Sequence, residues 1–158
     1  MLNSKLLKLS LFVSMSVVLL SACDKGVYHV QSHNFKNERW SNQDTAYFEV
    51  MAEDTLSLMN FYLKLRTSTA YLYSNLWVYL QTEAPDGSVS SEAQRINIAN
   101  PDGSWIGNTS GSIVNSSLVF ARQHFPIKGL YKFKVVQATS LNEIENVLDL
   151  TMEVQKAE

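Results

Sequence analysis

Apolar and polar side chains alternate at every second position in three separate stretches of this chain. The stretches are residues 59–66, 130–135 and 148–155. Successive side chains of a β-strand point to opposite faces of a sheet, so a period of two predicts strands with one buried and one wet face. The alternation therefore favours a fold built from sheets.

Five further segments have the composition of strands, and short turn sequences separate them. The expected strands cover residues 27–33, 46–53, 75–82, 93–98 and 118–124, with Trp105 on a short additional one. Pro-Asp-Gly-Ser occurs at 85–88 and again at 101–104, where the fixed proline angle and the Asp-Gly pair favour tight reversals. This spacing predicts an all-β fold, an antiparallel β-sandwich of the jelly-roll or immunoglobulin-like type.

The alternation also predicts which side chains form the core. The expected core residues are Phe61, Leu63, Leu65, Leu76, Val78, Tyr131, Phe133, Val135, Leu148, Leu150 and Met152. Most of the chain's aromatic residues are expected in the core as well, because large apolar side chains are usually buried. The best helical candidate is residues 141–146, which suffice for a turn or two only.

The amino terminus has the charge and hydropathy pattern of an export signal. Lys5 and Lys8 precede residues 9–20, which are apolar apart from three serines. This stretch is shorter than the roughly 20 apolar residues that a membrane-spanning helix needs, which favours a signal peptide. Leu20-Ser21-Ala22-Cys23 then matches the bacterial lipobox, in which the cysteine thiol receives diacylglycerol.

The lipobox predicts the organisation of the chain. Residues 1–22 are expected to be a lipoprotein signal peptide, residues 23–27 a short tether, and residues 28–158 a single β-sandwich domain. The alternative is a conventional signal peptide followed by an ordinary thiol at Cys23. Because Cys23 is the only cysteine, the exported domain is expected to have no internal disulfide and to depend on its core for stability.

A lipidated Cys23 predicts a protein of the cell envelope. Acyl chains contribute about 0.8 kcal/mol per buried methylene, so two or three of them anchor a protein durably. Asp24 and Lys25 do not form the run of acidic residues that we would look for as a surface-export signal. We therefore expect a membrane partner through Cys23 and an outer-membrane anchor that faces the periplasm.

Residues for catalysis or metal binding are scarce in this sequence. His29 and His33 are four apart, but on a strand they would lie about 13 Å apart at roughly 3.3 Å per residue, too far to bind one ion. Catalysis would need a cleft that gathers His124 with acidic side chains. Basic residues form no cluster or stripe. The sequence thus predicts no enzyme, no metal, no cofactor and no nucleic-acid partner.

Several short motifs in the middle and at the end of the chain occur together in a recognisable order. They are Arg66, Tyr73-Ser74-Asn75-Leu76-Trp77, Asp102-Gly103-Ser104-Trp105-Ile106-Gly107, Phe125-Pro126, Gly129-Leu130-Tyr131 and Gln137-Ala138. In order and spacing they resemble the GldH gliding-motility lipoproteins of Bacteroidetes. The resemblance covers roughly the whole chain after Cys23, and the Tyr-Ser-Asn-Leu-Trp and Gly-x-Trp-x-Gly segments are its specific part.

The resemblance implies a non-catalytic envelope lipoprotein, accessory to gliding motility or to the type IX secretion machinery that shares its components. Envelope proteins would then be its partners. The matched positions supply four candidate interaction residues: Arg66, Asn75, Trp77 and Trp105. They either maintain the fold or, for a Trp105 exposed on its loop, contact a protein or a sugar. The usual burial of aromatic residues in a sandwich favours fold maintenance.

A carbohydrate-binding or adhesin-like lipoprotein is the alternative function. Aromatic residues on the loops of a sandwich commonly stack on sugar rings, and Trp40 and Trp105 are the candidates for this role. Exposure of both tryptophans would support glycan binding, and their burial would count against it.

Two threonines are candidate sites of O-linked glycosylation. Asp44-Thr45-Ala46 and Asp54-Thr55-Leu56 resemble the Asp-Thr-apolar sequence at which exported Bacteroidetes proteins receive sugar. We therefore expect modification at Thr45 and Thr55. Intact-mass measurement of the native protein tests this expectation, because polypeptide plus lipid alone would exclude it.

Overall fold

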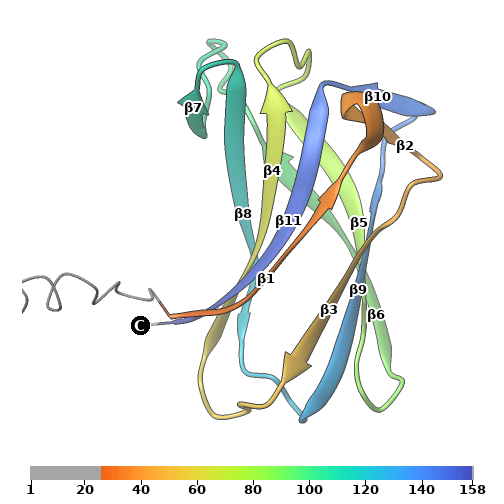
Figure 1. Ribbon diagram of the computed structural model, residues 1–158, viewed down its shortest axis with the longest axis vertical. Helices are drawn as coiled ribbons and strands as arrows, with labels where there is room; N and C mark the ends of the chain where they lie inside the picture. Colours follow the sequence, from red (N-terminus) through yellow and green to blue (C-terminus); the bar gives the residue numbers. More distant parts are fainter. Residues whose placement is uncertain (1–25, 158) are drawn as a thin grey trace, which may run out of the picture.

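Residues 26–157 are described by a computed structural model, in which two antiparallel sheets pack face to face (Figure 1). The expected signal peptide, residues 1–22, and the expected lipidation site, Cys23, lie outside the described residues. Within residues 26–157, no helix is long and apolar enough to cross a membrane. The all-β sandwich that the alternation predicted is confirmed.

One sheet has five strands in the order β1-β11-β4-β8-β7 and the other has four in the order β3-β9-β5-β6. The strands of the first sheet are β1 (Val27–Asn34), β11 (Val147–Lys156), β4 (Met59–Ser68), β8 (Ile113–Gln123) and β7 (Asn108–Ser110). Those of the second are β3 (Ala46–Ala52), β9 (Gly129–Gln137), β5 (Asn75–Glu83) and β6 (Val89–Asn97). A separate pair joins β10 (Glu143–Glu145) to β2 (Arg39–Ser41), which follows a short 3-10 turn, η1 (Lys36–Glu38).

The strand order identifies the type of sandwich. From β1 through β3 and β4 to β5, consecutive long strands lie alternately in the two sheets. In an immunoglobulin-like domain the first two strands would instead share a sheet. Because β1 pairs with β11 and β3 pairs with β9, each sheet joins an early strand to a late one. This is the connectivity of a jelly roll, one of the two types that the sequence left open.

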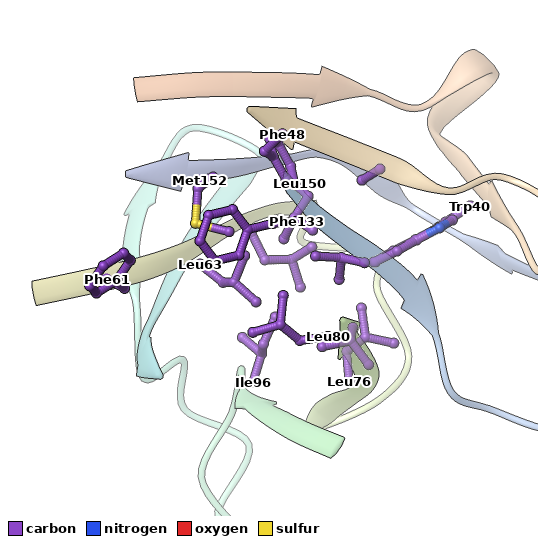
Figure 2. Packing of buried hydrophobic residues seen from close by; sticks show 14 of the residues in the cluster. Trp40, Phe48, Phe61, Leu63, Leu76, Leu80, Ile96, Phe133, Leu150 and Met152 are labelled. Atoms are coloured by element: carbon purple, nitrogen blue, oxygen red, sulfur yellow. The ribbon is translucent and has the colours of Figure 1, made fainter. Parts of the chain in front are cut away.

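The inward side chains of both sheets form one core (Figure 2). In β3, every second residue is buried and every residue between is exposed, as a period of two requires. Leu63 of β4 lies beside Phe133 of β9, and the ring centroids of Phe61 and Phe133 are 6.3 Å apart. All of the expected core residues are buried except Leu148.

The burial predicted for Leu148 is wrong, because β11 contains a bulge. The pairing of β11 with β4 shifts register between Val147 and Asp149. An extra residue in one strand shifts the alternation locally. Val147 and Asp149 are therefore buried, and Leu148 is only half-buried.

The helix predicted for residues 141–146 is also wrong, since this segment contains strand β10. Leu141 and Ile144 have the spacing of a helical face, but Ile144 is buried opposite Trp40 in the β10–β2 pair. Arg39 of β2 joins the two strands further, because its guanidinium contacts Glu143 Oε1 at 2.9 Å and Glu145 Oε1 at 2.8 Å. Three-residue strands are too short to show a period of two.

Candidate functional site

A cleft of about 490 Å³ opens between two connections at one end of the sandwich. One connection, residues 69–74, joins β4 to β5, and the other, residues 138–142, joins β9 to β10. Both lie at the upper end of the molecule in Figure 1. The lining residues are Tyr71, Leu72, Tyr73, Ser74, Asn75, Trp77, Thr139, Ser140, Leu141 and Ile144. We call this site the motif cleft, because it contains most of the Tyr-Ser-Asn-Leu-Trp segment.

Tyr71 fixes the first wall of the motif cleft. Its ring is buried, its hydroxyl donates to the carbonyl oxygen of Asn75 at 3.3 Å, and burial raises its pKa above the ordinary tyrosine value. The ring of Tyr73 packs edge-on against it, with centroids 5.6 Å apart. With Tyr71 held inside, Leu72 is left 85% exposed.

A buried amide on β9 organises the opposite wall. Nε2 of Gln137 donates to the carbonyl oxygen of Leu141 at 2.7 Å, and its Oε1 accepts bonds from the backbone N–H and the hydroxyl of Thr139, at 2.9 and 2.7 Å. The next residue, Ala138, donates its backbone N–H to the carbonyl oxygen of Trp77 at 2.8 Å. These bonds fix the position of residues 138–141 relative to β5.

Exposed apolar side chains gather around the motif cleft. Leu72, Tyr73, Trp77 and Leu141 all line it and are all exposed, with Trp77 44% accessible. The guanidinium of Arg95 lies over the Trp77 ring at 5.8 Å from its centroid. Apart from the two tyrosines, the described residues that line the cleft carry no ionisable group. The arrangement suits burial of apolar groups, with hydroxyls and an amide for hydrogen bonding.

The structure brings only two of the four candidate interaction residues, Asn75 and Trp77, into the motif cleft. Arg66 lies on β4 and pairs with Asp149 of β11, with Nε and Nη2 at 2.6 and 2.5 Å from Oδ2. The hydrogen bond and the charge of Asp149 raise the pKa of Arg66, while the Asp149 side chain is only 4% exposed. Arg66 thus neutralises a nearly buried carboxylate.

Trp105, the fourth candidate, does not line the cleft. It forms an isolated bridge with Ala99 and packs half-buried against the core. The backbone N–H groups of Ile98 and Ala99 both donate to the carbonyl oxygen of Ser74, at 2.8 and 3.0 Å. The segment that carries Trp105 therefore supports the cleft wall at Ser74.

The sugar-stacking role considered for Trp40 is wrong. Trp40 is fully buried, its ring stacks on Phe35 with centroids 4.4 Å apart, and its Nε1 donates to the carbonyl oxygen of Asp44 at 2.9 Å. Trp40 looked like a loop residue because polar residues surround it in the sequence. Pairing with β10 places it in the core instead.

The histidines lie away from the motif cleft. His29 is half-buried, and burial lowers its pKa although a hydrogen bond with Gln31 opposes the shift. His33 Nε2 lies 3.0 Å from Asp44 Oδ1, and His124 is exposed. Across residues 26–157, no group of three or more His, Cys, Asp or Glu is placed to hold a metal ion.

Thr45 and Thr55 are both half-buried, immediately before β3 and in the β3–β4 connection. Their glycosylation stays a prediction.

The sequence did not predict the roles of Leu72, Gln137 and Leu141 in the cleft. Gln137 was among the matched motifs, and that was the one signal pointing to this wall.

The strand order places the chain among jelly-roll β-sandwich proteins. The family model described as GldH lipoprotein matches residues 27–154, and the chain belongs to this family. The resemblance seen in the motifs is thereby confirmed. Membership of a lipoprotein family implies a lipid anchor and a location in the cell envelope.

Two curated relatives match along most of their length. The chain is 25% identical over 151 residues to the gliding motility lipoprotein GldH homolog of Christiangramia forsetii. It is 24% identical over 149 residues to the gliding motility lipoprotein GldH of Flavobacterium johnsoniae. Each match covers 90% of this chain and 92% of the relative.

Similarity to solved structures is weaker. The infectious bursal disease virus VP2 subviral particle matches with a TM-score of 0.39 and 13% identity, over 81% of this chain and 32% of the viral chain. The Yersinia pseudotuberculosis-derived mitogen matches with a TM-score of 0.35 and 5% identity, over 82% of this chain and 87% of the mitogen. Scores this low support no conclusion about fold or function.

Proposed function

We propose that this protein is a non-catalytic accessory lipoprotein of the gliding or type IX secretion machinery, and that its motif cleft holds a segment of an envelope partner protein. The names of the two relatives support the association with gliding motility. The lining of the cleft, which offers apolar and hydrogen-bonding groups, supports binding as its activity.

The observation that carries this proposal is the group of exposed apolar residues around the cleft. Leu72, Tyr73 and Trp77 project from a domain whose other large side chains mostly fill a well-formed core. Apolar groups exposed together on a soluble domain commonly mark an interaction site. Trp and Tyr are the side chains most often found as anchors of protein interfaces.

The position of the cleft fits an anchored protein. In this proposal the chain is cleaved before Cys23, residues 23–27 tether the lipid, and residues 28–158 form the domain. β1 begins in the lower half of the molecule in Figure 1, whereas the two connections that line the cleft lie at the upper end. An anchor in the outer membrane would then leave the cleft facing the periplasm.

Site-specific photo-crosslinking in the native organism tests the proposal. A photoreactive amino acid in place of Leu72 should crosslink to a component of the gliding or secretion machinery. The same group in place of Val119 serves as the matched control, because Val119 is also exposed but lies on β8 in the opposite sheet. Trp77→Ala should weaken the crosslink from position 72 and impair gliding or secretion when it replaces the native chain.

Two results would contradict this function. One is equal crosslinking from positions 72 and 119, together with unchanged gliding and secretion after deletion of the gene. The other is glycan-array binding that Trp77→Ala abolishes, which would favour the carbohydrate-binding alternative. Of the two tryptophans that this alternative named, Trp40 is buried and Trp105 is half-buried, so Trp77 and the nearby hydroxyls are the better exposed groups for a sugar.

A further inference from the structure

We propose that the connection between β3 and β4, residues 53–58, is a second membrane contact in which the side chain of Leu56 enters the bilayer that holds the lipid anchor. The proposal goes beyond the role of the motif cleft and depends on acylation at Cys23. It predicts one preferred orientation of the domain on the membrane.

Leu56 is the most exposed large apolar residue among the described residues, with 88% of its surface accessible. The connection between β8 and β9 lies at the same end of the molecule in Figure 1, and its Ile127 is exposed. The free energy falls when a leucine side chain exposed beside a membrane moves from water into the acyl-chain region. A membrane surface therefore suits this end of the sandwich.

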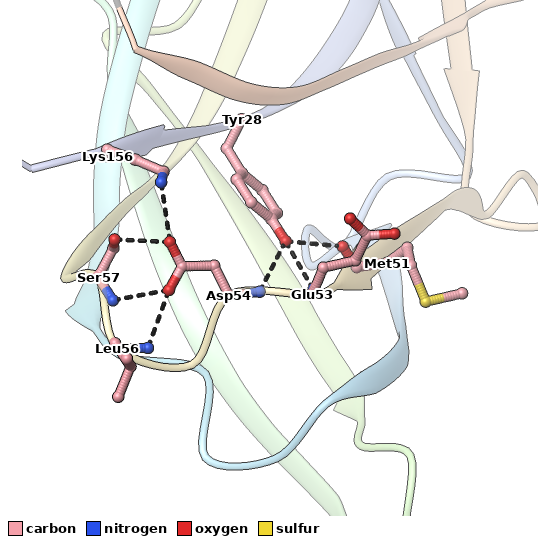
Figure 3. Close-up of polar contacts among 7 residues, drawn as sticks. All are labelled: Tyr28, Met51, Glu53, Asp54, Leu56, Ser57 and Lys156. Atoms are coloured by element: carbon pink, nitrogen blue, oxygen red, sulfur yellow. Dashed lines mark hydrogen bonds and ion pairs between the residues drawn. The ribbon is translucent and has the colours of Figure 1, made fainter.

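The connection that carries Leu56 is held by a cluster of polar contacts (Figure 3). Asp54 Oδ1 accepts the backbone N–H groups of Leu56 and Ser57, both at 2.9 Å. Its Oδ2 accepts the Ser57 hydroxyl at 2.6 Å and Lys156 Nζ at 2.8 Å. These bonds hold the pKa of Asp54 well below the ordinary value for an aspartate.

A tyrosine holds the other side of the same connection. The Tyr28 hydroxyl accepts the backbone N–H of Glu53 at 2.7 Å and donates to the carbonyl oxygen of Met51 at 3.1 Å. With Asp54 paired to Lys156 and Tyr28 bonded to the backbone, the Asp54 carboxylate and the backbone N–H groups of Glu53, Leu56 and Ser57 have partners within the protein. Leu56 is the large apolar residue that this turn exposes.

The expected anchor leaves the domain beside this connection. The carbonyl oxygen of Gly26 accepts the backbone N–H of Lys156 at 3.0 Å, and Ala157 donates its backbone N–H to the carbonyl oxygen of Leu58 at 2.7 Å. Cys23 precedes Gly26 by three residues, which span at most roughly 10 Å when fully extended. The acyl chains therefore enter the bilayer within a short reach of residues 53–58.

Depth measurement with spin labels tests this contact. Leu56→Cys and Leu72→Cys are each labelled with a nitroxide in the full-length lipidated protein, whose native cysteine is acylated and cannot react. Leu72 is the matched control because it is almost equally exposed, at 85%, but lies at the opposite end of β4. The proteins are placed in vesicles of phosphatidylethanolamine and phosphatidylglycerol. Power saturation then compares collisions with oxygen, which concentrates in acyl chains, and with a water-soluble nickel chelate.

We expect the ratio of oxygen to nickel collisions to be several-fold higher at position 56 than at position 72. Equal ratios in protein that floats with the vesicles would overturn the membrane contact and leave the proposed role of the cleft intact. Purified protein whose mass lacks acyl chains would overturn both the anchor and this contact. Circular dichroism and thermal unfolding should match the unsubstituted protein, since both leucines are exposed.

Discussion

Gly103 and Gly107 lie in the same connection but are required for different reasons. Gly103 has a φ of 85°, in the left-handed region that favours glycine, and Asp102 accepts the Ser104 backbone N–H beside it. A Cβ on Gly107 would lie 1.9 Å from the carbonyl oxygen of Asn115, closer than atoms can approach. Gly107 therefore permits a close approach of two backbones, and Gly103 permits a turn.

Gly107→Ala should lower the free energy of unfolding by about 2 kcal/mol or more, because backbone atoms must move to make room for the methyl group. Urea unfolding measures the loss. Gly87→Ala is the control: a Cβ there meets nothing within 4 Å, so the variant carries only the strain of a positive φ, about 1–2 kcal/mol. A smaller loss for Gly107→Ala than for Gly87→Ala would contradict the close approach.

Substitution of Arg66 should lower stability, whereas substitution of Trp77 should weaken partner binding. Arg66→Ala leaves the nearly buried Asp149 carboxylate without its partner, so we expect a loss of about 2 kcal/mol of stability, less than for a fully buried pair because Arg66 is half-exposed. Trp77→Ala should leave stability nearly unchanged and weaken partner crosslinking. Thermal unfolding and crosslinking yield measure the two effects. Weak crosslinking in a fully stable Arg66→Ala variant would instead make Arg66 an interaction residue.

At the scale of the elements, the motif cleft depends on how β9 ends. Gln137 is the last residue of β9 and is buried, and its side chain forms three hydrogen bonds with the connection that follows. The opposite wall depends on Tyr71, which lies in the connection between β4 and β5 and donates its hydroxyl to the Asn75 carbonyl oxygen. The cleft is thus shaped by two side chains that hold loops rather than by a continuous groove in a sheet.

Gln137→Ala should loosen residues 138–142 and cost about 1–3 kcal/mol, since backbone groups at Thr139 and Leu141 lose their partners. Hydrogen exchange measured by mass spectrometry should become faster in this connection and stay unchanged in β4. Gln43→Ala, at an exposed glutamine between β2 and β3, is the control. Unchanged exchange at residues 138–142 would show that the loop does not depend on Gln137.

The sequence predicts elements better than it predicts what they assemble. Alternation at residues 59–66 predicted β4 with its end within two residues of the observed one. A strand with one buried face has apolar residues at every second position, so its sequence shows the period directly. The alternation gave no warning of the bulge at Leu148 or the pairing of Trp40 with Ile144, which depend on strands distant in the chain. The cleft combines residues 71–77 with 139–144 for the same reason. Motif resemblance found Asn75 and Trp77, but it did not distinguish them from Arg66.

At the scale of the whole molecule, anchoring and stability should be independent. Cys23 is the only cysteine and precedes the described residues, so the sandwich of residues 26–157 contains no disulfide. Its core, hydrogen bonds and ion pairs oppose the entropy gained on unfolding without a covalent crosslink.

Cys23→Ala should therefore move the protein out of the membrane fraction without changing its unfolding midpoint. A chain without acyl groups loses the free energy of about 0.8 kcal/mol per methylene that holds it in a bilayer. Detergent partitioning and thermal unfolding measure the two quantities. The wild-type protein treated with a reductant is the control, and its midpoint should not change. A Cys23→Ala protein that remains with the membrane although its mass shows that residues 1–22 have been removed would contradict acylation as the anchor.

The pairing of β1 with β11 also sets the order in which the molecule can fold. These are the first and last strands of the described chain, and β11 lies between β1 and β4 in the sheet. β1 therefore cannot join the five-stranded sheet until residues 147–156 are present to pair with it, even if the earlier strands have already formed. A chain that crosses a narrow export channel from its amino terminus would thus be unable to complete this sheet, and would stay able to pass through the channel, until its last segment had crossed.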